Sequence, residues 1–117
     1  MKLSRRPRRL RDLKTAKSMV RECELNKEDL ILPVFVSDHC KSKEKIESMP
    51  EVYRWSIDEL LRQIESWHKI GINAFALFPC VEDHKKCSLG KEALNSDSVC
   101  YRAAKKIKEI FNNNVQI

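Results

Sequence analysis

Apolar segments with the composition of β-strands recur at a nearly constant spacing along this chain. They begin near residues 31, 72 and 114, so the repeat is about 41 to 42 residues long. The segments between them show the periodicity of amphipathic helices. Strands that alternate with helices predict right-handed βαβ units and a parallel sheet. Because residues 30–36 are continuously apolar, we expect the first strand to be covered on both faces, and we expect residues 72–78 to form a second buried strand.

Pro33 lies in the middle of the first predicted strand. Proline has no N–H group to donate to a strand ladder, so it argues against an ordinary central strand. We therefore expect the first strand either to lie at an edge of the sheet or to be irregular. Residues 37–54, which follow, are polar and charged, and the sequence predicts a loop there with a turn at Met49 and Pro50.

The helix after this loop has the clearest boundaries in the chain. Ser56 and Glu59 have the spacing of a reciprocal capping box, and Trp55 and Leu60 have the spacing of a hydrophobic staple. Gly71 is expected to end the helix because glycine readily takes a positive φ. The predicted apolar face comprises Ile57, Leu60, Leu61, Ile64 and Trp67.

Two further helices are predicted, one before the first strand and one after the second. The first is a modest amphipathic helix from Leu10 to Cys23. The second follows a polar loop at residues 80–96, and Asp97 or Ser98 can cap it. Its predicted apolar face comprises Val99, Cys100, Ala103, Ile107 and Phe111.

The length of the repeat predicts how many units a closed fold would need. Eight units would require roughly 330 residues, which is within the usual range of a (β/α)₈ barrel. This chain has 117 residues, enough for about two units and the start of a third strand. We therefore predict an α/β fold that is an incomplete barrel, with a basic arm and short helix at residues 1–28 and a truncated barrel domain at residues 29–117.

The positive charge of the chain is concentrated at its start. The formal net charge is +6, and residues 1–11 contain six basic residues and no acidic one. Such a cluster can bind nucleic acid by neutralising phosphates. It is accompanied by no recognition helix, aromatic stacking platform or zinc-finger spacing. No segment is apolar enough to cross a membrane or to serve as a secretory signal. Five cysteines without an export signal favour reduced thiols and a cytoplasmic location.

Read in order, several segments resemble 5-aminolevulinate dehydratase, also called porphobilinogen synthase. The resemblance is collinear and covers essentially the whole chain. Glu51 departs from it because the family usually has glycine there, and Ser96 and Ser98 stand where proline and glycine are common. The matching segments are 6–11 (RPRRLR), 19–22 (MVRE), 29–36 (DLILPVFV), 48–50 (SMP), 52–54 (VYR), 56–60 (SIDEL), 71–72 (GI), 76–79 (ALFP) and 90–95 (GKEALN).

The resemblance implies a (β/α)₈ barrel that condenses two 5-aminolevulinate molecules to porphobilinogen in tetrapyrrole and heme biosynthesis. It implies two Schiff-base lysines on later strands, and either zinc held by a cysteine-rich loop after the third strand or magnesium. These positions lie beyond Ile117. We therefore assign no catalytic, cofactor-binding or metal-ligating residue here, and expect the chain alone to be inactive. The arm is implied to reach around a neighbouring subunit of a homo-octamer.

One group of residues in the chain could hold a metal. Cys80, His84 and Cys87 lie in a loop after the second strand, and His39 and Cys40 lie in the loop after the first. A structural zinc site needs four ligands, and no CxxC pattern is present. The interpretation we prefer is therefore unconnected loop side chains, with a composite site as the alternative.

Other charged side chains have simpler explanations. Asp58 and Glu59 occupy a first helical turn, where capping and the helix dipole account for them. The lysines at 41, 43, 45, 85, 86 and 91 lie in polar loops, so we expect solvated charges and no Schiff-base lysine among them. The competing function is a non-enzymatic α/β binding module whose basic arm binds nucleic acid.

Overall fold

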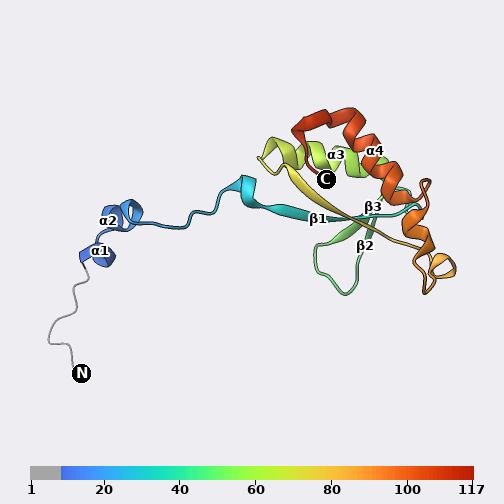
Figure 1. The fold of residues 1–117 in the computed structure, drawn as a ribbon, viewed down its shortest axis with the longest axis horizontal. Helices are drawn as coiled ribbons and strands as arrows, with labels where there is room; N and C mark the ends of the chain where they lie inside the picture. Colours follow the sequence, from blue (N-terminus) through green and yellow to red (C-terminus); the bar gives the residue numbers. More distant parts are fainter. Residues whose placement is uncertain (1–8) are drawn as a thin grey trace, which may run out of the picture.

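The computed structural model describes residues 9–117, so most of the basic cluster predicted at residues 1–11 lies outside the described part of the chain. The described residues form a four-stranded sheet in the order β2–β3–β1–β4. Helices α3 and α4 lie together over one face of this sheet (Figure 1). The longer elements are β1 (Ile31–Val36), α3 (Ile57–Lys69), β4 (Ala74–Pro79) and α4 (Val99–Phe111). The short ones are α1 (Arg9–Asp12), α2 (Lys14–Met19), β2 (Lys43–Lys45), β3 (Tyr53–Trp55) and four 3₁₀ turns, η1 (Lys27–Asp29), η2 (Asp83–Lys85), η3 (Lys91–Leu94) and η4 (Asn112–Asn114).

The predicted parallel pairing is confirmed. Strands β1 and β4 pair in parallel over six residues, from Ile31 with Ala74 to Val36 with Pro79. The third predicted strand is present as a parallel bridge between Ala74 and Gln116. There the N–H of Phe75 donates to the carbonyl of Gln116 at 2.9 Å. Each successive predicted strand is therefore added beside the previous one, on the same side of the sheet.

Pro33 lies in a strand that has neighbours on both sides, contrary to the expectation of an edge strand. Strand β1 is irregular in one respect: its pairing with β3 is short and covers only Phe35 and Val36. The N–H of Ser37 donates to Trp55 of β3 at 2.9 Å. Backbone groups alternate in direction along a strand, so the nitrogen of Pro33 points to the same side as that of Ser37, beyond the end of the β3 pairing. No ladder bond is lost there.

Part of the loop predicted at residues 37–54 is a β-hairpin, so that prediction was wrong for its second half. Strands β2 and β3 pair antiparallel from Lys43 with Trp55 to Lys45 with Tyr53. The ammonium of Lys43 lies 4.8 Å from the centre of the Tyr53 ring, a cation–π contact that favours the pairing. The turn predicted at Met49 and Pro50 is confirmed, and Val52 closes it by donating to the Met49 carbonyl at 3.2 Å.

Glu51, in this turn, has a φ of +62°, which is the left-handed region. A side chain with a β-carbon is strained there, whereas glycine is not. The backbone has therefore kept the conformation that glycine favours, although glutamate occupies the position.

We expect Glu51→Gly to raise the free energy of unfolding by about 1 kcal/mol because it removes this strain. Urea unfolding followed by tryptophan fluorescence measures the change. Glu47→Gly in the same turn is the control, because Glu47 has no positive φ and should lose stability with glycine. Equal effects of the two changes would contradict the prediction.

Helix α3 begins where the sequence predicts, but only half of the capping box forms. The hydroxyl of Ser56 accepts a hydrogen bond from the N–H of Glu59 at 3.4 Å. The reciprocal bond is absent from the described structure because the N–H of Ser56 donates to the carbonyl of Ser42 in the hairpin instead, at 2.8 Å. The Glu59 carboxylate pairs with Arg62 at 3.2 Å. Gly71 follows the helix with a φ of +95°, as predicted.

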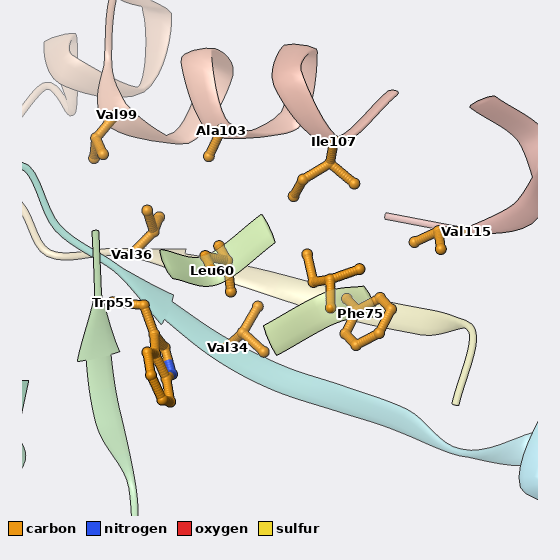
Figure 2. Close-up of a cluster of buried hydrophobic side chains, with 10 residues drawn as sticks. Val34, Val36, Trp55, Leu60, Phe75, Val99, Ala103, Ile107 and Val115 are labelled. Atoms are coloured by element: carbon orange, nitrogen blue, oxygen red, sulfur yellow. The ribbon is translucent and has the colours of Figure 1, made fainter. Parts of the chain in front are cut away.

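The core lies between the sheet and the two helices. Figure 2 shows Val99, Ala103 and Ile107 of α4 pointing toward the strands. The predicted faces of α3 and α4 are confirmed, with Cys100 only half-buried. The buried residues of this core cluster are Val34, Val36, Trp55, Leu60, Ile64, Phe75, Val99, Ala103, Ile107 and Val115.

The opposite face of the sheet is uncovered among residues 9–117, so the prediction that the first strand is covered on both faces was wrong for this part of the chain. Phe35 and Phe78 lie on that face, with their ring centres 5.5 Å apart. Phe78 is 47% exposed. Alternation along the strands places Ile31, Pro33, Ala74 and Ala76 on the same open face.

The helix predicted from Leu10 to Cys23 is two short helices, α1 and α2, separated at Leu13. Leu13 has an extended backbone (φ −97°, ψ 127°), which interrupts the helical hydrogen bonding. These helices lie away from the sheet (Figure 1). Their apolar side chains, which include Leu13 and Met19, are exposed because no core is within reach.

Candidate functional site

The carboxyl ends of β1 and β4 lie side by side, and their loops leave the same edge of the sheet. Val36 is in register with Pro79, and the N–H of Cys80 donates to the Val36 carbonyl at 2.8 Å. Residues 37–42 and 80–98 therefore come together, as predicted for the two loops. In parallel α/β folds this edge is where ligands bind.

Glu82 joins the two loops. One oxygen of its carboxylate is 3.0 Å from Nε2 of His39, in the loop after β1. The other oxygen is 3.3 Å from Nε2 of His84 and 3.2 Å from Nζ of Lys85. The hydrogen bond from Lys85 lowers the pKa of Glu82, and the charges of His39, Lys85 and His84 act in the same direction. The lowered pKa favours the ionised form of Glu82, whose carboxylate is shared by His39, His84 and Lys85.

A second ion pair connects the loop after β1 with α4. The guanidinium of Arg102 pairs with the carboxylate of Asp38. Nε of Arg102 also donates to the backbone carbonyl of Asp97 at 3.0 Å. Arg102 therefore fixes the start of α4 against the end of β1. A cavity of about 550 Å³ lies here, and its lining includes Asp38, His39, Glu82 and Arg102.

An adjoining cavity of about 600 Å³ lies between the hairpin and the loop after β4, and it shares Cys80, Val81 and Lys85 with the first. Its apolar wall includes Phe35, Met49 and Val81. Its polar groups come from the hairpin and from the loop after β4. They are Arg54, Lys85, Lys86, Glu92 and the two cysteines Cys80 and Cys87.

The cysteines near this edge differ in their surroundings. The thiol of Cys40 is half-buried among the carbonyls of Ser37, Ser42 and Arg54, and burial raises its pKa. Cys87 is exposed, and the N–H of Lys91 donates to its sulfur at 3.4 Å. Donation from this and neighbouring backbone N–H groups lowers the pKa of Cys87. The Cys87 thiol therefore loses its proton more easily than the Cys40 thiol.

The fold and these loops match one family. A family model described as delta-aminolevulinic acid dehydratase matches residues 4–117. The chain belongs to the delta-aminolevulinic acid dehydratase family. It is 38% identical over 109 residues to the family's member from Chlamydia pneumoniae, covering 93% of this chain and 33% of the relative. It is 40% identical over 114 residues to the Helicobacter pylori (strain J99) member, covering 97% and 35%.

A crystal structure of a dehydratase from Toxoplasma gondii ME49, in complex with the reaction product porphobilinogen, has the same fold. Its TM-score with this chain is 0.83 at 36% identity, and the match covers 93% of this chain and 31% of that one. The family resemblance predicted from the sequence is therefore confirmed. The chain spans about a third of the length of the dehydratases it matches.

The composite metal site considered for this dehydratase-family chain is not formed by the described residues. His39 and His84 lie at the same carboxylate, that of Glu82, whereas the sulfur of Cys87 accepts a hydrogen bond from its own loop. Among residues 9–117, no three histidine, cysteine, aspartate or glutamate side chains are placed to hold a metal ion. A metal ion of the kind that the family uses does not fit this set of donors, and we derive no step through it.

The loop lysines are surface cations in this member of the dehydratase family. Lys85 pairs with Glu82, and Lys86 pairs with Asp83 at 2.7 Å. The hydrogen bond with Asp83 raises the pKa of Lys86. A lysine that forms a Schiff base needs a lowered pKa, so Lys86 is unsuited to that role. Of the two carboxylates in the first turn of α3, Asp58 pairs with Lys106 of α4 at 3.1 Å and ties the two helices together.

Sequence reasoning missed Glu82 and the pair of Asp38 with Arg102. Each contact joins segments that are far apart in the chain, and single charged residues in polar loops give no local signal. The parallel order of β1 and β4 was the one available clue that the loops would meet. None of the helices within residues 9–117 has the length and apolar composition that crossing a lipid bilayer requires.

Proposed function

We propose that this chain supplies the first two βα units and the start of the third strand of a (β/α)₈ barrel that acts as a porphobilinogen synthase. The substrate would be 5-aminolevulinate, two molecules of which condense to porphobilinogen. The observation that carries the proposal is the collinear likeness, at 36% identity, to the dehydratase from Toxoplasma gondii whose structure contains porphobilinogen.

The direction in which the sheet grows supports the barrel. From β1 to β4 to Gln116, strands are added on one side, and α3 and α4 cover the same face. A barrel needs this arrangement because all its helices form one outer ring. A doubly wound sheet would place helices on both faces. In the barrel proposed here, Phe35 and Phe78 on the open face would point to the interior.

The chain's own contribution to this function would be to build the barrel wall and to fix the loops at its carboxyl end. Glu82 and Arg102 hold the loop after β1 against the loop after β4 and against α4. We assign no catalytic, cofactor-binding or metal-ligating role to residues 1–117. The zinc or magnesium of the family would bind to other parts of the complete protein.

The proposed domain division is an arm at residues 1–28 and a barrel portion at residues 29–117. The arm would contact a neighbouring subunit in a homo-octamer in the cytoplasm. The apolar side chains of Leu13, Met19 and Leu25 support this contact, because each is more than half exposed and none belongs to the core cluster of the described residues. The competing nucleic-acid function depends on the basic arm, which lies largely outside the described residues, and it stays a prediction.

A chimera tests the proposed function. The segment of the Helicobacter pylori relative that matches this chain is replaced by residues 1–117, and porphobilinogen formation is measured. We expect activity within about 100-fold of that relative, because a misplacement of about 1 Å costs on the order of 100-fold. The relative without the segment is the control and should be inactive. A chimera that folds and assembles but forms no porphobilinogen would contradict the proposal.

A further inference from the structure

The first turn of α4 forms one wall of the cavity of about 550 Å³, and the proposed dehydratase function does not use this wall. Residues 97–102 all contribute to it. Arg102 is the first residue of α4 whose N–H donates to a carbonyl, that of Ser98 at 3.1 Å. Among the described residues, the N–H groups of residues 99–101 have no acceptor. They carry the partial positive charge of a helix N-terminus.

Ser98 adds a buried hydroxyl group to these donors. It is the N-cap residue of α4 and has the extended backbone (φ −63°, ψ 153°) of that position, yet its side chain makes no capping hydrogen bond. Ser98 is 6% exposed, and it lines the cavity. No side-chain polar atom of the described residues is both fully occluded and unpaired, so this hydroxyl opens on the cavity. A bound molecule can give it the hydrogen bond that the helix does not.

Glu92, in the same wall, supplies a carboxylate that can pair with a cation. Its two oxygens accept hydrogen bonds from Nδ2 of Asn95 at 3.2 and 3.3 Å, and it forms no ion pair within residues 9–117. The other carboxylates of the wall are already paired, as Asp38 with Arg102, Asp97 with Arg102 and Glu82 with Lys85. Glu92 is therefore the carboxylate of this wall that is available to a ligand.

The charges of the wall disfavour an anion. Four carboxylates line the cavity, whereas Lys85 and Arg102 are the only lysine and arginine side chains in its wall. A carboxylate or phosphate ligand would bond to the N–H groups of α4 but would be repelled by this excess of negative charge. A neutral carbonyl oxygen accepts the same hydrogen bonds without that repulsion. An ammonium group on the same molecule gains from the negative charge.

We propose that this cavity binds small primary amines that carry a neutral carbonyl group, such as the amides of short amino acids. The carbonyl oxygen accepts hydrogen bonds from the Ser98 hydroxyl and from the free N–H groups in the first turn of α4. The ammonium group pairs with Glu92. The carbon chain between these two groups lies against the apolar side chains of Val81 and Ala93, which also line the cavity.

The test uses the full 117-residue chain, isotope-labelled for NMR, and three probes. These are glycinamide, β-alaninamide and 4-aminobutanamide, in which the ammonium and carbonyl groups are progressively further apart. Each is compared with the simple amide and the simple amine of the same chain length. Shifts of the backbone amide signals of residues 98–102 during titration at pH 7 give the Kd. We expect the tightest of the three to bind about 5- to 10-fold more tightly than either matched compound, which lacks one of the two contacts.

Two substitutions separate the two contacts. Ser98→Ala should weaken binding of the tightest probe about 5-fold and should weaken the simple amide as well. Glu92→Gln should weaken the probe by a similar factor but leave the simple amide unchanged. Ser96→Ala and Glu109→Gln are the matched controls, because both residues are exposed and lie outside the cavity wall. Since the Ser98 hydroxyl does not cap α4, Ser98→Ala should leave the urea midpoint of unfolding nearly unchanged.

Three results would overturn the proposal. If none of the probes shifted the signals of residues 98–102, the cavity would not be a binding site. If the matching amino acids, which have a carboxylate in place of the amide, bound as tightly as the amides, the class of ligand would be wrong. If the control variants weakened binding as much as Ser98→Ala and Glu92→Gln, the assigned contacts would be wrong. None of these results depends on dehydratase activity.

Discussion

Replacing Ile107 by alanine is expected to lower the free energy of unfolding by about 3 kcal/mol. Ile107 is 1% exposed and lies on the face of α4 that packs against the sheet and α3. The substitution removes three carbon atoms, so buried apolar surface is lost and a cavity is left. The surrounding core comes from several elements, including Leu60 of α3 and Phe75 of β4, and it can collapse into that space only in part (Figure 2).

Ile110 provides a matched control. It has the same side chain in the same helix but is 57% exposed. Ile110→Ala should change the free energy of unfolding by no more than about 0.5 kcal/mol, because little packing is lost and alanine favours the helix. Urea unfolding can be followed by the fluorescence of Trp55 and Trp67, which both lie at the core. Similar losses for the two variants would show that α4 is not packed as described.

The periodic parts of the fold were predictable because their signals are local. The apolar faces of α3 and α4 follow from a period of 3.6 residues, and Ser56 marks the start of α3 through a contact only three residues long. The parallel strands followed from length and from β-forming residues. In each case the residues that determine an element lie within that element or within a few positions of it.

The hairpin and the connection between the loops were not predictable in this way. Strand β2 consists of Lys43, Glu44 and Lys45, which are poor strand formers, and it exists because β3 pairs with it. The bond from Ser56 to Ser42 depends on that hairpin and displaces the reciprocal half of the capping box. The contact of Glu82 with His39 likewise requires β1 and β4 to be placed first. All three features depend on contacts between segments that are distant in the sequence.

The second large effect concerns Phe78, on the open face of the sheet. Its contribution to stability should depend on whether the chain is isolated or part of a complete barrel. Phe75 and Phe78 lie on opposite faces of β4, with 3% and 47% of their surfaces exposed. In the isolated chain, kept dilute enough to stay monomeric, Phe78→Ala should cost only about 1 kcal/mol, largely from the lost contact with Phe35. Phe75→Ala should cost about 3 to 5 kcal/mol because it removes a core side chain.

In the chimera with the Helicobacter pylori relative, we expect Phe78→Ala to cost about 3 to 5 kcal/mol as well. Side chains of alternate strand residues fill the interior of a closed barrel, so Phe78 would be buried there. Phe75→Ala should cost the same in both settings, because helices α3 and α4 cover it in each. The measurement is the free energy of unfolding in urea for the two variants in both proteins. If Phe78→Ala were as mild in an active chimera as in the isolated chain, the open face would not point into a barrel, and the proposed architecture would be wrong.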